Sequence, residues 1–153
     1  MPSPASPTPF VHRNLPRLLL QAREAVMANA RPRLRAHELS DQQWRVLRVL
    51  GEDHAGGGNG LETGRIAREA FILGPSLTGM LQRMERDGLI RRERDPEDQR
   101  RTVVQATPKG LRIAKKLASA IEEHYVWMEE SLGKEKLAQL YALLDDVIQL
   151  EQG

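Results

Sequence analysis

The hydrophobic positions between residues 75 and 88 recur with the period of an α-helix. They are three or four residues apart and share one face: Leu77, Leu81 and Met84. Pro75 suits the first turn of a helix, Gly74 is an acceptable cap before it, and Gly88 is a typical stop after it. The pattern predicts a helix over residues 75–87. Its free face carries small or hydrogen-bonding residues, namely Ser76, Thr78, Gly79, Gln82, Arg83 and Arg86.

Two short strand-like runs, residues 89–94 and 101–105, follow this helix directly. The connection between them opens with Asp95 and Pro96. Aspartate suits the first position of a type I turn and proline presets the backbone of the second, so the pattern predicts a β-hairpin with a fixed tip. Arg100, which lies on the far side of that tip, suits DNA phosphates or a narrow minor groove.

The helix and the hairpin together have the layout of a winged helix-turn-helix. In that motif one helix enters the major groove of DNA, and the hairpin, called the wing, lies beside it. The alternative is that the acidic residues of the hairpin only pair with its arginines on a solvated surface. In the DNA-binding interpretation, Asp98 orients Arg100. The predicted DNA-binding residues are Pro75, Ser76, Thr78, Gly79, Gln82, Arg83, Arg91, Arg94, Arg100 and Arg101.

In four segments the chain resembles the MarR (multiple antibiotic resistance regulator) family of dimeric bacterial transcription factors. These segments are Gly-Pro-Ser-Leu-Thr at residues 74–78, residues 84–92, residues 95–101 and Thr-Pro-Lys-Gly at residues 107–110, within a likeness that covers residues 15–150. The resemblance implies a mainly α fold with a small β-hairpin wing. It places Ser76, Thr78 and Arg83 on the recognition helix and Arg100 on the wing.

The sequence departs from the usual pattern of the family in two places. Ala106 stands where the family usually has leucine, which weakens the expected packing of the wing on the following helix. The glycine-rich residues 56–60 lengthen a connection that is normally tight, so we expect a mobile loop there.

Residues 19–27 and 39–50 are similar to the branch of the family that regulates the breakdown of homoprotocatechuate and related aromatic acids. This likeness implies a small aromatic or heteroaromatic carboxylate as the effector, the ligand that releases the regulator from DNA. The family places the effector pocket between the winged domain and the dimerisation helices. A carboxylate needs a cation or amide donors, and an aromatic ring needs an apolar wall. The candidates are Arg23, Arg17, Met27, His37 and Trp44.

Two of these candidates have an alternative role. Arg23 interrupts an otherwise apolar helix, which makes it the preferred cation, but it could equally form an ion pair or lie on the surface. Trp44 has the helical spacing with Leu47 that is typical of a residue anchored in the core, and we favour that role over a ligand wall.

Apolar patterns elsewhere predict further helices before the hairpin. A stripe from Leu15 to Ala30 predicts a helix that ends near Pro32, and a second, short helix over residues 33–37. Ser40 forms a capping box with Gln43 and opens the helix that carries Trp44. Residues 63–70 are expected to form the first helix of the helix-turn-helix pair.

After the hairpin, Thr107 and Pro108 cap and start a long amphipathic helix, which Gly133 separates from a last helix. These helices are too few to bury their own apolar faces. Pairing with a second copy would bury them, and folding back on the winged domain is the alternative. We therefore expect a disordered tail (residues 1–9), an N-terminal dimerisation region (10–36), a winged helix-turn-helix domain (37–106) and C-terminal dimerisation helices (107–150).

Charge is distributed unevenly along the chain. Residues 1–118 have 21 basic and 13 acidic side chains, a balance of +8, whereas residues 119–153 have 2 and 8, a balance of −6. The basic part can face a polyanion such as DNA. No segment resembles a membrane span or a signal peptide, so we expect a cytoplasmic protein. With no cysteine, the chain cannot sense oxidants through a thiol.

No combination of residues predicts catalysis, a metal site or a cofactor. The histidines lie at no metal-ligand spacing, and Ser76 and Thr78 have no nearby acid or histidine to activate them. Together, the motif and the family resemblance predict a homodimeric repressor that binds a pseudo-palindromic operator in double-stranded DNA, and the resemblance implies release by an aromatic acid. A ligand-independent architectural DNA-binding protein and a protein-interaction module are the alternatives.

Overall fold

The computed structural model describes residues 9–151. The predicted tail at residues 1–9 therefore lies outside the described residues, apart from Pro9. The elements follow in the order α1 (Leu15–Ala36), α2 (Asp41–Ala55), β1 (Leu61–Glu62), α3 (Thr63–Ala70), α4 (Gly74–Arg86), β2 (Ile90–Arg94), β3 (Thr102–Ala106), α5 (Pro108–Leu132) and α6 (Lys134–Ile148). The predicted fold class, mainly α with a small wing, is confirmed.

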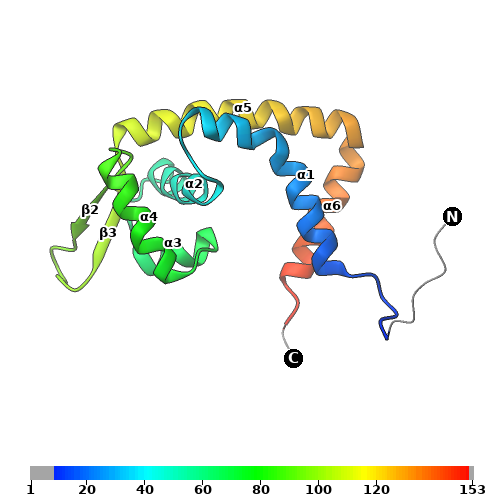
Figure 1. The fold of residues 1–153 in the computed structure, drawn as a ribbon, viewed down its shortest axis with the longest axis horizontal. Helices are drawn as coiled ribbons and strands as arrows, with labels where there is room; N and C mark the ends of the chain where they lie inside the picture. The colour runs from blue at the N-terminus through cyan, green and yellow to red at the C-terminus, as the bar shows by residue number, and fades with distance from the viewer. Residues whose placement is uncertain (1–8, 152–153) are drawn as a thin grey trace.

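The elements form two groups joined by the long helix α5 (Figure 1). At one end of α5 lies a winged domain made of α2, α3, α4 and the sheet. At the other end, α6 and the first half of α1 form an arm that leaves α5 at a steep angle. None of the helices within residues 9–151 is long and apolar enough to cross a membrane.

Helix α1 corrects one expectation from the sequence. It was predicted to end near Pro32, with a separate helix over residues 33–37, but a single helix continues through Pro32 to Ala36. Proline inside a helix removes one backbone hydrogen bond. Burial of Ala30 and Leu34 on either side of it, at 7% and 1% exposure, offsets that loss.

The core of the winged domain comes from the predicted apolar stripes. The capping box between Ser40 and Gln43 is present and starts α2. Helix α3 has the predicted bounds. Helix α4 turns four apolar side chains into the core, and each contributes about 1.5–3 kcal/mol through burial: Leu77, Met80, Leu81 and Met84. Trp44 is buried among the core residues, as its spacing with Leu47 predicts.

The sheet has three antiparallel strands in the order β1-β3-β2. The predicted hairpin is present, and its register pairs Ile90 with Ala106 and Arg94 with Thr102. Strand β1 was not predicted, because two residues are too short to show an alternating pattern. It pairs Leu61 with Val104 and so closes the sheet on the side that faces α3.

A cluster of short contacts joins the end of α4 to the start of α5. Thr107 caps α5 by accepting a hydrogen bond from the Gly110 backbone N–H, and its hydroxyl donates to the carbonyl of Gly88 at 2.5 Å. The Thr107 N–H donates to the carbonyl of Leu89 at 3.0 Å. Gly88 itself has φ +76°, which favours glycine. We call Gly88, Leu89, Thr107 and Gly110 the α4–α5 clasp.

The arm and the adjoining end of α5 leave large apolar side chains exposed. They are Leu15, Leu19, Leu20, Val126, Trp127, Leu132, Leu140, Tyr141, Leu143, Val147 and Ile148. If these helices folded back on the winged domain, as the alternative holds, their apolar faces would be covered. In the single chain these apolar faces are exposed.

We predict that Gly110→Ala destabilises the winged domain by about 1–3 kcal/mol, because a Cβ at Gly110 would collide with the Leu89 carbonyl oxygen inside the clasp. Chemical denaturation at a fixed protein concentration measures this change. Gly64→Ala in α3 is the matched control, since its Cβ would meet only the Arg68 side chain at 3.6 Å. If Gly110→Ala were as stable as the wild-type protein, the close approach of Gly110 to the Leu89 carbonyl would not be a constraint.

Candidate DNA-binding site and effector cavity

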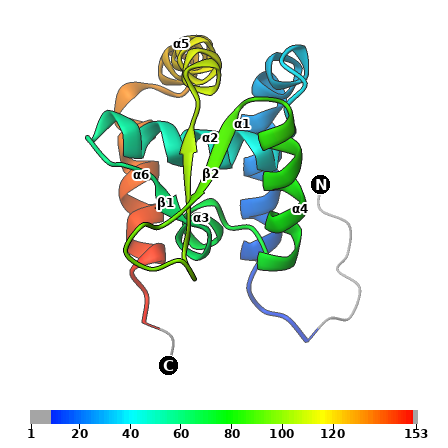
Figure 2. The ribbon, with the colours of Figure 1, turned by 90° about the vertical axis from the view of Figure 1, so that its left-hand side faces the viewer.

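The recognition helix α4 presents one free face. Opposite its four buried apolar side chains, Ser76, Thr78, Gln82 and Arg83 are exposed and Gly79 is half-exposed, as predicted. Helix α3 packs against α4, and β2 contacts α4 on its other side. Figure 2 shows α4 and the hairpin next to each other on the face turned towards the viewer. The two groups of predicted DNA-binding residues therefore lie on adjacent elements.

The wing is fastened to the recognition helix by one ion pair. The Arg92 guanidinium donates to the Glu85 carboxylate at 2.9 Å, and the Arg92 backbone N–H donates to the same carboxylate at 3.2 Å. The side-chain hydrogen bond from Arg92 lowers the pKa of Glu85 below its usual value. Glu85 is thus ionised at neutral pH and holds β2 against the last turn of α4.

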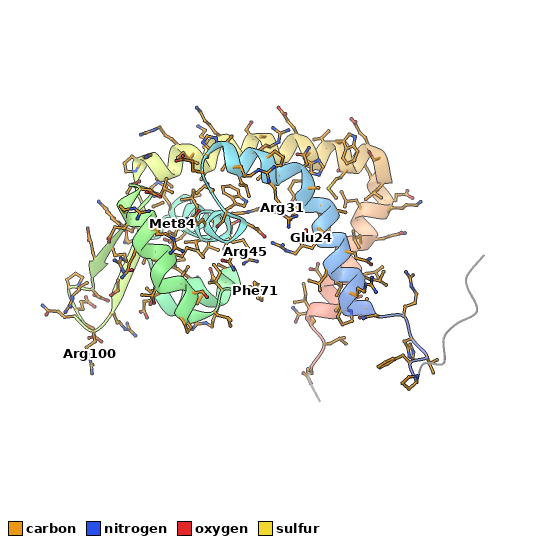
Figure 3. The ribbon with its side chains drawn as sticks, viewed as in Figure 1. Glu24, Arg31, Arg45, Phe71, Met84 and Arg100 are labelled. Atoms are coloured by element: carbon orange, nitrogen blue, oxygen red, sulfur yellow. The ribbon has the colours of Figure 1, made fainter. Side chains whose placement is uncertain are left out.

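Local hydrogen bonds fix the tip of the wing. Asp95 accepts a hydrogen bond from the Glu97 backbone N–H at 2.9 Å, the Asx turn that an Asp-Pro start favours. Asp98 accepts from both the backbone N–H and Nε of Arg100, at 3.1 and 3.2 Å. The Arg100 side chain is nevertheless 92% exposed and stands at the outer end of the wing (Figure 3). Asp98 therefore orients Arg100, as expected.

The other wing arginines are engaged to different extents. Arg91 lies 3.8 Å from Glu93 and Arg101 lies 4.0 Å from Asp98, so the alternative of pairing within the hairpin describes part of it. Arg101 also pairs with Glu62 of β1 at 3.2 Å. Arg94 is exposed at the end of β2. The Arg100 side chain is more exposed than those of Arg91, Arg92 and Arg101, which fits its predicted role as the wing arginine.

A cavity of about 470 Å³ opens between α2 and α5. Its walls are mostly apolar and include Trp44 on α2, and the charged lining residues are Arg48, Lys115, Glu52 and Glu122. The lining residues are Trp44, Arg48, Gly51, Glu52, His54, Ala55, Leu111, Ala114, Lys115, Ala118, Ile121 and Glu122. An aromatic wall beside a guanidinium and an ammonium group is a suitable environment for an aromatic carboxylate.

Arg48 keeps its charge in this cavity. Partial burial opposes the charged form, but hydrogen bonds to Glu52 and Tyr125 outweigh that effect and raise the pKa of Arg48 above its usual value. Sequence reasoning missed Arg48 as a candidate. Its position, four residues after Trp44 in α2, is the signal that could have found it, because residues at this spacing lie on the same helix face.

The predicted effector residues lie in different places. Trp44 lines the cavity, whereas the other four are not among its lining residues. Arg23 forms an ion pair with Asp41 at 2.8 Å that joins α1 to α2. Met27 packs against the core, His37 is the C-cap residue of α1, and Arg17 is exposed.

These features define a winged helix-turn-helix transcriptional regulator, a class of protein that acts by binding DNA and not by catalysis. A model of the MarR family matches residues 37–101. The chain is 38% identical to the HTH-type transcriptional regulator FarR of Neisseria gonorrhoeae over 145 residues, or 95% of this chain and 96% of that protein. It is 41% identical to the homoprotocatechuate degradative operon repressor of Escherichia coli over 140 residues, or 92% and 91% of the two chains.

Among solved structures, the crystal structure of NadR in complex with 4-hydroxyphenylacetate has a TM-score of 0.80 and 38% identity. The similarity covers 95% of this chain and all of the NadR chain. The chain belongs to the MarR family. The family resemblance and its aromatic-acid branch, both predicted from short motifs, are confirmed.

We predict that Arg100→Ala weakens binding to many DNA sequences alike, because one phosphate contact is lost. The plot of log affinity against log salt should become less steep, its negative slope shrinking in magnitude by about 1. Fluorescence anisotropy across a salt series measures both quantities. Lys116→Ala, which removes an exposed charge from α5, is the control and should change neither. An unchanged affinity and slope for Arg100→Ala would refute the assignment of the wing.

Proposed function

We propose that the protein is a homodimeric repressor of an operon for the breakdown of an aromatic or heteroaromatic acid. It binds a pseudo-palindromic operator, and a small aromatic carboxylate releases it. The observation that carries this proposal is the apolar cavity between α2 and α5, with Trp44 as its aromatic wall and Arg48 and Lys115 as its cations. The cavity lies next to the winged domain that would read the DNA.

The exposed apolar faces of the arm support the homodimer. Leu140, Tyr141 and Val147 on α6 and Leu19 and Leu20 on α1 stay between 40% and 64% exposed in one chain. A second copy packed against them would remove this surface from water, and each side chain would contribute about 1–2 kcal/mol. A two-fold dimer places two recognition helices on successive major-groove faces roughly 34 Å apart, which explains a pseudo-palindrome.

The cavity and the relatives both support an aromatic carboxylate as the effector. A carboxylate can pair with Arg48 or Lys115 while its ring lies against Trp44 and the aliphatic residues of α5. A repressor of homoprotocatechuate breakdown and a structure that holds 4-hydroxyphenylacetate are both similar to this chain over most of its length. Arg48 is favoured over Arg23 because Arg48 lines the cavity, whereas Arg23 is not among the lining residues.

Release from DNA requires that the effector bind one arrangement of the dimer better than another. A ligand between α2 and α5 fixes the relation of the winged domain to the helix that carries the arm. Because the α4–α5 clasp joins α5 to the end of the recognition helix, a shift of α5 moves α4 as well. The two recognition helices then no longer match the spacing of the operator.

The test is anisotropy binding of the protein to the DNA upstream of its own gene and to a scrambled duplex, at fixed salt, with a panel of aromatic carboxylates. We expect preference for the upstream DNA, abolished by one acid. Equal binding to both duplexes that no acid changes would contradict the proposal and favour an architectural DNA-binding protein. No binding at moderate salt would favour a protein-interaction module.

The same assay tests the site. Arg48→Ala should bind the active acid about 10- to 100-fold more weakly, the loss expected for a charge-assisted hydrogen bond, and should keep its affinity for DNA without the acid. Arg65→Ala is the matched control for acid affinity. Arg65 pairs with Glu69 as Arg48 pairs with Glu52, four residues apart on a helix, but lies outside the cavity. Unchanged acid affinity in Arg48→Ala would place the effector elsewhere.

A further inference from the structure

The N-terminal tip of the recognition helix is apolar, in contrast to the rest of its free face. Leu73 is the N-cap residue of α4, and 78% of it is exposed. Gly74 and Pro75 follow it and are exposed as well. Ser76 is therefore the first residue of the tip with a hydrogen-bonding side chain. The leading edge of α4 offers a partner only one large side chain, the aliphatic group of Leu73.

The side chain of Leu73 does not cap its own helix, although its backbone carbonyl accepts hydrogen bonds from the Ser76 and Leu77 N–H groups. Serine, threonine, aspartate and asparagine are favoured at the N-cap because a side-chain oxygen accepts a hydrogen bond from the first turn, which leucine cannot do. Helices α2 and α5 are capped in this way by Ser40 and Thr107, whereas no side chain caps α4. The exposure of Leu73 also means that it contributes little to the core. A residue that breaks a local rule and is not buried in the core is expected at a functional site.

We propose that Leu73 contacts the methyl group of a thymine in the major groove and so determines part of the DNA sequence specificity. This inference rests on the proposed function. Base edges in the major groove present donors, acceptors and the thymine C5-methyl group, and only the methyl matches an aliphatic side chain. Leu73 adjoins the polar face that begins at Ser76 and Thr78, so it extends the DNA surface already described.

The backbone beside Leu73 can come close to DNA. Apart from its two chain neighbours and the backbone of its own helix, a Cβ added at Gly74 would meet no atom within 4 Å, so the first turn of α4 is open on this side. Glycine at this position leaves that space unfilled. The tip can therefore enter the groove far enough for Leu73 to reach a base edge, while Ser76 and Thr78 contact the neighbouring base pairs.

The experiment begins with a duplex that the full-length protein selects from a random library. Each thymine of the two half-sites is then replaced in turn by deoxyuridine, which removes only the methyl group, and the affinity is measured by anisotropy at fixed salt. For wild type, we expect one thymine position at which deoxyuridine weakens binding about fourfold per half-site, the value of one buried methyl group. At that position Leu73→Ala should bind thymine and deoxyuridine duplexes equally.

Two further variants separate reading of DNA from stability. Leu73→Ser restores an N-cap oxygen, so it should raise the Tm by roughly 2–4 °C while it loses the preference for thymine over deoxyuridine. Opposite changes in the two readouts would not arise from a purely structural role. Phe71→Ala is the control, because Phe71 is also exposed, at 85%, on the turn before α4 but precedes its N-cap. It should keep the preference.

The outcomes distinguish the two proposals. If Leu73→Ala weakens binding to thymine and deoxyuridine duplexes by the same factor, the side chain lies against the sugar-phosphate backbone and the inference is wrong. It is also wrong if wild type shows no position that depends on the methyl group, or if the dependence persists in Leu73→Ala. If wild type selects no duplex at all, the proposed function fails, and this inference fails with it.

Discussion

The α4–α5 clasp is the constraint on which the rest of the arrangement depends. Thr107 both caps α5 and binds the carbonyl of Gly88 at the end of the recognition helix. Gly110 lies so close to the Leu89 carbonyl that no side chain fits between them. The helix that reads DNA and the helix that carries the arm are therefore fixed to each other at one point. The wing shares this anchor, because Leu89 leads directly into β2 and Arg92 binds Glu85 on α4.

This geometry gives the cavity its importance. The cavity lies between α2 and α5, so an occupant contacts both the winged domain and the long helix. The clasp is rigid because its groups are hydrogen-bonded and closely packed, and packed interfaces change between discrete arrangements instead of deforming smoothly. A ligand of modest size can thus affect the orientation of α4 without touching it. The Arg23–Asp41 ion pair in turn links α1 to α2.

Much of the fold could be predicted from the sequence, because the helices and the hairpin carry local signals. The Ser40 and Thr107 caps and the apolar spacing of Leu77 and Met84 gave the elements around the site. The helix break at Pro32 was wrong, because burial of Leu34 outweighs the preference of proline. Strand β1 was missed because its pairing with β3 is a non-local contact that two residues do not reveal.

The sequence predicted the candidate DNA-binding surface better than it predicted the cavity. The candidate DNA-binding residues come from one helix face and one hairpin, and both are local patterns. The cavity depends on how α2 packs against α5, and that packing brings Arg48 next to Lys115 from a distant part of the chain. Only Trp44 of the five predicted effector residues lines it, since side-chain type alone cannot show that Arg23 is already paired.

The central claim is that occupation of the cavity changes the spacing of the two recognition helices. The chain has no cysteine, so Arg86→Cys at the exposed end of α4 gives one spin-label site per protomer. Electron-electron double resonance then measures the distance between the two labels in the dimer. We expect operator DNA to select one narrow distance distribution and the active aromatic carboxylate to shift the distribution away from it. A distribution that the acid leaves unchanged, while it still releases the DNA, would contradict this account.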